Sequence, residues 1–168
     1  MIFLTTGTQL SFDRLVRAVD EWADETKPSC GIFGQVLPAT HDPYTPRNFE
    51  TKARLSPADY AEVFSKANLI ISHAGMGTIL TALTQDKQIC IMPRQIKYGE
   101  HRNNHQLATV ERLKEHPRLF KARDEHDLPR CLDAAMQAVG TSQTAAIDPF
   151  AATDFTDKLR KFVLNTGK

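Results

Sequence analysis

The sequence predicts one α/β domain, with a mainly parallel β-sheet between helices on both of its faces. Short apolar runs alternate along the chain with segments whose apolar residues recur at helical spacing, which is typical of repeated strand–helix–strand units. The run Leu69-Ile70-Ile71 is apolar on both sides, as expected for a strand that is covered on both faces. The length of 168 residues suits a single domain with a sizeable core.

Strands are expected at 2–5, 30–36, 49–55, 68–72, 89–92 and 119–121. The first helix follows a Gly-containing turn, with Ser11 as its N-cap. One apolar stripe defines its buried face: Phe12, Leu15, Val16, Val19, Trp22 and Ala23. A loop with three prolines, 37–48, joins the second and third strands. The second helix should begin after Ser56, because an N-cap serine precedes a proline and Asp59 stands in the first turn.

The second half of the chain continues the alternation, with helices expected at 78–85, 101–115, 128–139 and 154–164. Gly140 is a suitable end for the third of these. A polar linker, Thr141–Thr153, leads to the last helix, whose apolar stripe consists of Phe155, Leu159, Phe162 and Val163. We therefore assign 1–153 to the domain and 154–168 to an amphipathic helix that packs on it or on a partner.

Composition and charge exclude several classes of protein. Lysine and arginine total 21 and aspartate and glutamate 20, so the formal charge is +1 and no nucleic-acid partner is expected. Cys30, Cys90 and Cys131 are odd in number and widely spaced, which indicates buried thiols in a reducing compartment rather than a disulfide or metal site. No signal peptide or run of about 20 apolar residues is evident, so a cytoplasmic location is expected.

The turn after the fourth strand is the first candidate site, because ligands of such sheets bind beyond the carboxyl ends of the strands. Gly75 and Gly77 bring backbone N–H groups to a helix start, where the dipole favours a phosphate or diphosphate. Thr78 can cap this helix or donate to a phosphate oxygen, although a turn that binds nothing is the alternative. A nicotinamide site is disfavoured, because Leu80 replaces the third glycine and the fifth strand ends without an acid.

The loop after the fifth strand, 94–106, is dense in hydrogen-bonding side chains that can reach the same cleft, although an exposed helix start is the alternative. Arg94 could pair with a phosphate. His101 and His105 have the spacing of metal ligands, but no nearby residues complete a site, so neither a metal nor a cofactor is expected. His73, at the end of a buried strand, is either a structural histidine or part of the site.

Three stretches together resemble the C-terminal domain of glycosyltransferase family 28, the donor-binding half of MurG-like enzymes: Ile71–Thr78, Met92–Arg94 and Tyr98–Gln106. The opening Phe3–Thr8 resembles the start of the stand-alone small subunits of this family. The later stretches look most like bacterial exopolysaccharide subunits of the PssE kind, and next most like the dolichol-pathway N-acetylglucosaminyltransferase subunit. The resemblance covers about residues 2–110.

The resemblance implies a Rossmann-like GT-B C-terminal half-domain, a UDP-sugar donor and inverting transfer to a lipid-linked acceptor. The donor-binding residues that it implies are Gly7, Thr8, His73, Gly75, Met76, Gly77, Thr78, Asn104 and Gln106. Thr81 stands where many relatives carry a ribose-binding glutamate, so that contact should be weaker or moved. Arg94 and the helix terminus should stabilise the UDP leaving group, and Glu100 or His101 is the candidate base if the base lies on this chain.

A full GT-B enzyme places its active site between two such domains, and this chain has room for one. The acceptor-binding half is therefore expected on a membrane-anchored partner subunit, which would bring this chain to the inner face of the membrane. Exopolysaccharide biosynthesis is the expected pathway. A non-catalytic nucleotide-sugar-binding or regulatory subunit is the alternative from another class. A nucleotide-sugar epimerase would need two half-domains in one chain.

Overall fold

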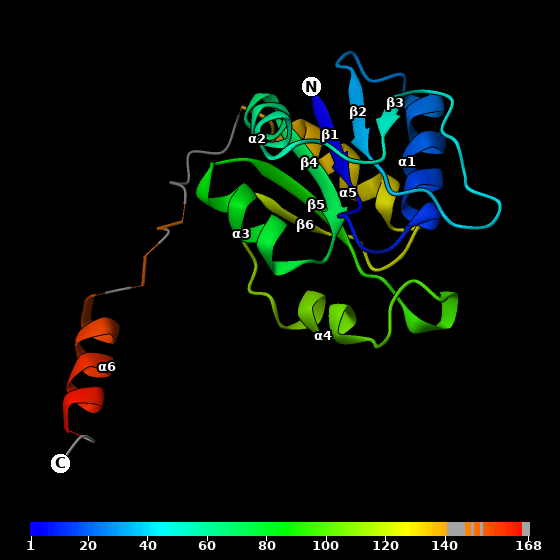
Figure 1. The fold of residues 1–168 in the computed structure, drawn as a ribbon. Helices are drawn as coiled ribbons and strands as arrows, with labels where there is room; N and C mark the ends of the chain where they lie inside the picture. Colours follow the sequence, from blue (N-terminus) through cyan, green and yellow to red (C-terminus); the bar gives the residue numbers. More distant parts are fainter. Residues whose placement is uncertain (141–146, 149, 152, 166–168) are drawn as a thin grey trace.

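In the computed structural model, six parallel strands form one sheet in the order β3-β2-β1-β4-β5-β6 (Figure 1). The structure describes residues 1–140, 147–148, 150–151 and 153–165. The strands are β1 (Ile2–Thr5), β2 (Ile32–Gln35), β3 (Glu50–Lys52), β4 (Leu69–His73), β5 (Gln88–Met92) and β6 (Leu119–Lys121). The predicted parallel sheet is therefore confirmed, and the strand order reverses between β1 and β4.

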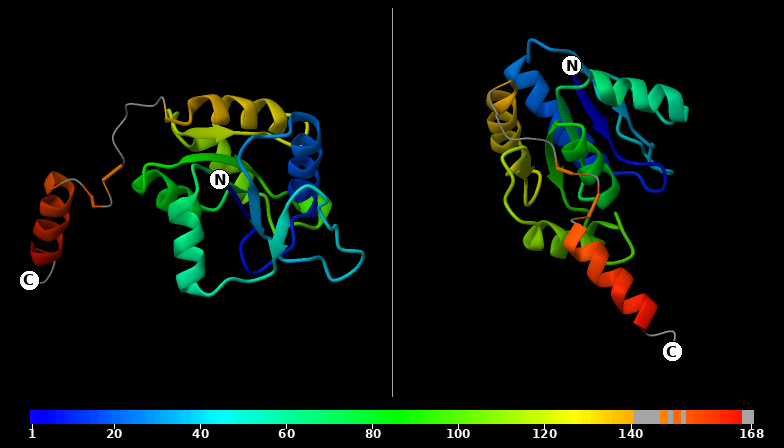
Figure 2. Two further views of the ribbon diagram at one scale, coloured as in Figure 1. Left: turned by 90° about the horizontal axis from the view of Figure 1, so that it is seen from above. Right: turned by 90° about the vertical axis from the view of Figure 1, so that its left-hand side faces the viewer.

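The helices are α1 (Asp13–Thr26), α2 (Pro57–Lys66), α3 (Met76–Thr84), α4 (His105–Arg112), α5 (Leu128–Ala138) and α6 (Thr153–Asn165), with a short 3-10 helix η1 (Ile96–Tyr98). Helices α1 and α5 cover one face of the sheet, and α2 and α3 cover the other (Figures 1 and 2). Side chains of β1 divide between these two cores, because alternate residues of a strand point to opposite faces. Ile2 and Leu4 pack with α1, and Phe3 packs with Phe64 of α2.

Some helix boundaries differ from the expectation, and tertiary contacts account for two of them. The N-cap of α1 is Phe12 rather than Ser11, because the Ser11 carbonyl accepts a hydrogen bond from Arg94 and belongs to the preceding loop. Helix α4 begins only at His105, since residues 96–104 fold into η1 and a loop in which Glu100 accepts from Arg14 and Asn104 accepts from Ile96 N. The capping role predicted for Ser56 is confirmed, with its hydroxyl accepting from Asp59 N.

The last helix, α6, projects away from the sheet in every view (Figures 1 and 2). Its apolar side chains, from Phe155 to Leu164, are 50–70% exposed, so the predicted stripe does not pack into the core. Much of the predicted linker falls on 141–146, 149 and 152, and the end of the predicted terminal segment on 166–168, all outside the described residues. Within the described part of the chain, every helix is too short or too polar to cross a membrane.

Candidate functional site

A pocket of about 340 Å³ opens at the carboxyl ends of β1 and β4, where the strand order reverses. The chain leaves β1 towards α1 on one face and leaves β4 towards α3 on the other, so a crevice forms between the two connections. The lining residues are Thr6, Gly7, Thr8, Gln9, Leu10, His73, Gly75, Arg94, His101, His105 and Gln106. The structure thus brings together segments that the sequence analysis selected after β1, β4 and β5.

The imidazole of His73 lies between two glycines that make room for it. A β-carbon at Gly75 would stand 2.4 Å from His73 Nε2, and one at Gly7 would stand 3.3 Å from His73 Cε1. Gly7 also has a φ of +78°, in the left-handed region that favours glycine. Gly75 has ordinary backbone angles, so His73 rather than backbone conformation explains why a glycine stands there.

His73 is a neutral imidazole at physiological pH. Burial lowers the pKa of His73 to about 4, and repulsion from the charged Arg94 adds to the effect, while a hydrogen bond with the Thr5 backbone opposes it. A neutral ring keeps one N–H donor and one acceptor nitrogen. It can therefore hydrogen-bond a ligand without adding a second full positive charge beside Arg94.

The first turn of α3 presents the second face of the site. Gly75 is its N-cap and supplies no side-chain cap, so the first amides of the helix depend on water or a ligand. A β-carbon at Gly77 would meet no atom within 4 Å, so open space lies directly over this turn. Met76 is exposed beside it, and Thr78 lies near the Tyr60 hydroxyl and lowers the pKa of that group, against the larger effect of burial. Met76, Gly77 and Thr78 therefore border the pocket lining rather than form part of it.

Arg94 contributes to the pocket wall, but its guanidinium is engaged by the protein. It is 3% exposed, and its two terminal nitrogens donate to the backbone carbonyls of Thr6, Leu10, Ser11 and Glu100. Burial lowers the pKa of Arg94 to about 10, although the Glu100 carboxylate opposes this shift. Its backbone N–H donates to Gln106 Oε1 at 3.1 Å, which places Gln106 at the base of the pocket.

Glu100, one of the expected candidate bases, is held in a buried ion pair. Arg14 Nε donates to Oε1 at 2.7 Å and Arg14 Nη2 to Oε2 at 2.8 Å, and Gln95 N also donates to Oε2. The carboxylate is 8% exposed and does not line the pocket. Arg14, which sequence reasoning missed, also pairs with Glu125, so Glu100 serves in this structure to join the loop after β5 to α1.

His101 and His105 stand at the mouth of the pocket, with ring centroids 4.5 Å apart in a T-shaped arrangement. Burial together with the charges of His105 and Arg94 lowers the pKa of His101, so its ring is neutral at physiological pH. Asn104 lies outside the lining and accepts from Ile96 N at 2.9 Å, which ties the ends of the loop 96–104 together. Among the described residues, no group of three or more His, Cys, Asp or Glu side chains is arranged to hold a metal ion.

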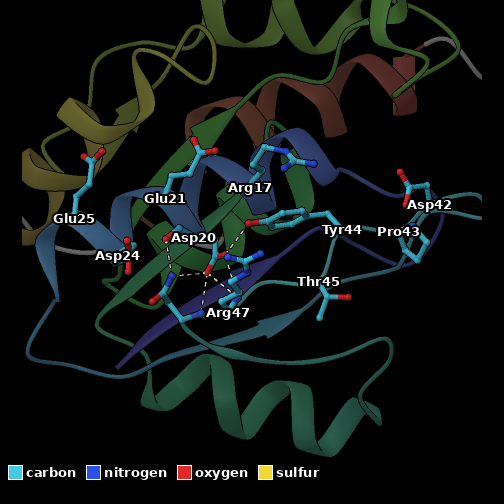
Figure 3. Close-up of a pocket in the computed structure, with 11 residues that line it drawn as sticks. Arg17, Asp20, Glu21, Asp24, Glu25, Asp42, Pro43, Tyr44, Thr45 and Arg47 are labelled. Atoms are coloured by element: carbon cyan, nitrogen blue, oxygen red, sulfur yellow. Dashed lines mark hydrogen bonds between the residues drawn. The ribbon is translucent and has the colours of Figure 1, made fainter.

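A larger hollow of about 650 Å³ lies on the flank of α1, but its central carboxylate is already satisfied (Figure 3). Asp20 is 3% exposed and accepts from the backbone amides of Arg47 and Asn48, from the Asn48 side chain and from the Tyr44 hydroxyl. Burial alone would raise the pKa of Asp20, but these bonds lower it overall. Asp20 therefore fastens the loop before β3 to α1, a role that the sequence analysis did not anticipate.

The model of the glycosyltransferase family 28 C-terminal domain matches residues 1–159. A search of curated proteins found no match. Among solved structures, the chain is similar to the NMR solution structure of ALG13, with a TM-score of 0.58 and 18% identity over 94% of this chain and 93% of that one. It is also similar to the crystal structure of the glycotransferase of kitacinnamycin, with a TM-score of 0.57 and 16% identity over 95% of this chain. This chain spans 38% of the second protein, and at these identities the likeness shows the fold alone.

Proposed function

Because this chain belongs to the family of glycosyltransferase family 28 C-terminal domains, whose Rossmann-like GT-B fold it shares, we propose that it binds the UDP-sugar donor of a two-component glycosyltransferase. The observation that carries the proposal is the uncapped start of α3, with open space over Gly77 and a neutral His73 alongside. A helix N-terminus of this kind suits a diphosphate, because its free N–H groups and its dipole both favour negative charge.

The diphosphate would lie against the amides of the first turn of α3 and be flanked by His73. Gly7 and Thr8, on the opposite rim, line the same pocket and would face the donor from the β1 side. The sugar or ribose would extend towards α4, where His105 and Gln106 line the pocket and Asn104 shapes the neighbouring loop. Thr81 Oγ1 donates to Gly77 O at 2.8 Å, so it is directed back to its own helix rather than to a ribose.

Transfer would rely on positioning and on stabilising the UDP leaving group. Glu100 is engaged by Arg14, which leaves His101 as the candidate on this chain for accepting the acceptor proton. A neutral imidazole is able to take that role. The base could equally be supplied by the partner that holds the acceptor.

The partner would be a membrane-anchored subunit that binds a lipid-linked acceptor, in exopolysaccharide biosynthesis, and would bring this chain to the inner face of the membrane. The exposed apolar stripe of α6 supports a docking role for that helix, since a short amphipathic helix is marginal unless its stripe is covered. The chain would then consist of a donor-binding domain, residues 1–153, and a partner-binding helix, residues 154–168.

The test uses two substitutions at Gly77. Gly77→Asp places a carboxylate in the open space over α3, where the helix dipole favours it but where it would repel a diphosphate. UDP and UDP-sugars should raise the melting temperature of the wild type and of the control Gly77→Ala, but not that of Gly77→Asp. A retained UDP response in Gly77→Asp would place the donor elsewhere, and a response to NAD but to no uridine diphosphate would overturn the assignment.

A further inference from the structure

Arg94 connects the loop after β1 with the loop after β5 through backbone carbonyls alone. Its Nη2 donates to Thr6 O at 2.7 Å and to Leu10 O at 2.8 Å. Its Nη1 donates to Ser11 O and to Glu100 O, the latter at 3.2 Å. Three of these four acceptors lie at the beginning and end of the loop 6–11, so one side chain holds both ends of that loop.

The guanidinium is fixed in this position from several sides. It lies over the ring of Phe12, with Cζ 4.7 Å from the ring centroid, and Phe12 is fully buried. The residue that supplies the fourth acceptor, Glu100, is held by the two hydrogen bonds from Arg14. Neither terminal nitrogen of Arg94 is thus free to turn towards a ligand without breaking bonds to backbone carbonyls.

Only arginine has the geometry for this set of contacts. A guanidinium presents its donors in a rigid planar fork, so two nitrogens can each serve two acceptors in different directions. A lysine ammonium keeps the charge but concentrates three donors on one atom, and it cannot reach all four carbonyls. The contribution of the charge can therefore be separated by experiment from that of the fork.

We propose that Arg94 is a positioning residue of the donor site, which holds the loop 6–11 in the shape that sets Gly7 and Thr8 at the rim of the pocket. It acts on the donor through this loop and not as a ligand of the phosphates. The inference rests on the proposed function for its link to the donor, whereas the hold on the loop is independent of it.

The first experiment compares Arg94→Lys and Arg94→Ala with the wild type, and uses Arg118→Lys as the control. Arg118 is also a buried arginine, but it pairs with Asp86 at the opposite end of the sheet. Both Arg94 variants should speed hydrogen exchange in residues 6–12 and weaken UDP binding by about tenfold or more, because a displaced rim no longer fits the donor. Arg118→Lys should change neither quantity.

Near-wild-type UDP affinity in Arg94→Lys, together with loss in Arg94→Ala, would overturn the proposal, because a phosphate contact needs mainly the charge. Unchanged exchange in residues 6–12 of Arg94→Lys would also overturn it. If the wild type binds no uridine diphosphate, the proposed function fails, while the exchange measurement still decides whether Arg94 holds the loop.

A second measurement needs no variant and so stands even if the Arg94 variants do not fold. In nitrogen-15 spectra of the wild type, the Nη groups of Arg94 should give separate resonances with slow rotation and slow exchange with water. Saturating UDP should leave these resonances in place. Averaged, rapidly exchanging Nη resonances, or a large shift of them on adding UDP, would contradict the positioning role.

Discussion

At the scale of single residues, the pocket depends on the absence of two β-carbons beside His73. Gly7 and Gly75 leave the space that the imidazole fills, and Gly77 leaves space that no protein atom fills. The sequence pointed to Gly75 and Gly77 as places where a ligand approaches the backbone, and the family resemblance added Gly7 at the edge of the cleft. It could not separate their roles, because the position of the His73 ring depends on tertiary contacts such as the hydrogen bond with the Thr5 backbone.

The burial of His73 predicts a loss of stability in mild acid. Its pKa is about 4 in the folded chain and about 6.5 when unfolded, so below pH 6.5 the unfolded chain binds a proton that the folded chain does not. The contribution of neutral His73 to the free energy of unfolding is therefore complete above pH 6.5 and is lost as the pH drops towards 4. At about pH 5 the expected loss is roughly 2 kcal/mol relative to about pH 7.5.

Urea unfolding of the wild type and of His73→Asn at these two pH values measures the loss of stability that His73 causes. The wild type should lose roughly 2 kcal/mol more than the variant, because the other ionisable groups, His101 and His105 among them, are common to both proteins. Equal losses in the two proteins would mean that His73 is accessible to protons in the folded state.

At the scale of elements, the loop before β3 is fastened to α1 by one carboxylate. Asp20→Ala would leave the amides of Arg47 and Asn48 without their acceptor, so we expect a loss of about 2–4 kcal/mol of unfolding free energy. Asp24→Ala on the same helix is the control, since Asp24 is exposed and its pair with Lys27 should contribute less than about 1 kcal/mol. Denaturant unfolding of both variants checks the difference, and equal losses would refute the fastening role.

Strands and helix stripes were predictable because burial gives a surface helix an apolar period of about 3.6 residues and gives a strand covered on both faces an unbroken apolar run. The apolar stripe of α1 and the uninterrupted apolar run of β4 are examples, and both lie in the cores as expected. Places where side chains bond to distant backbone were not predictable. The pairing of Arg14 with Glu100 and the N-cap of α1 depend on contacts between residues more than 80 positions apart. The late start of α4 depends on the loop before it, which is closed by the hydrogen bond from Ile96 N to Asn104.

The location of the candidate site was predictable from the sequence, but the roles of its individual residues were not. The topology places the ends of β1, β4 and β5 at one edge, which is why Gly7, His73, Gly75 and Gln106 lie on one pocket. The roles of single residues could not be read from the sequence, because sequence patterns do not show which polar side chains already have hydrogen-bond partners within the protein. Arg94 and Glu100 are polar residues in a ligand-facing loop, yet their main partners are protein atoms.

At the scale of the whole molecule, the exposed stripe of α6 predicts a partner. Removing residues 154–168 should leave a folded domain that still binds UDP, because the apolar side chains of the stripe are exposed and belong to neither core. The truncated chain should no longer hold the membrane subunit, and sugar transfer in a reconstituted mixture should be lost with it. A pull-down with circular dichroism as the folding control tests this, and full partner binding by the folded truncation would contradict it.

The proposal that the acceptor-binding half lies on a partner also predicts that activity depends on that partner. The purified chain should transfer little or no sugar to a lipid acceptor, and transfer should appear when the membrane subunit is added. Robust transfer by this chain alone would show that it carries a complete active site.

Mapping UDP onto the isolated chain by amide chemical shifts tests the central claim most directly, because the hollow on the flank of α1 is larger than the candidate site and competes with it. Shifts should concentrate at residues 75–78, at the loop 6–10 and at His105, around the crevice between β1 and β4. Residues around Asp20 on the flank of α1 should be unaffected. Shifts that cluster around Asp20, or no shifts at saturating UDP, would contradict the assignment of the donor site.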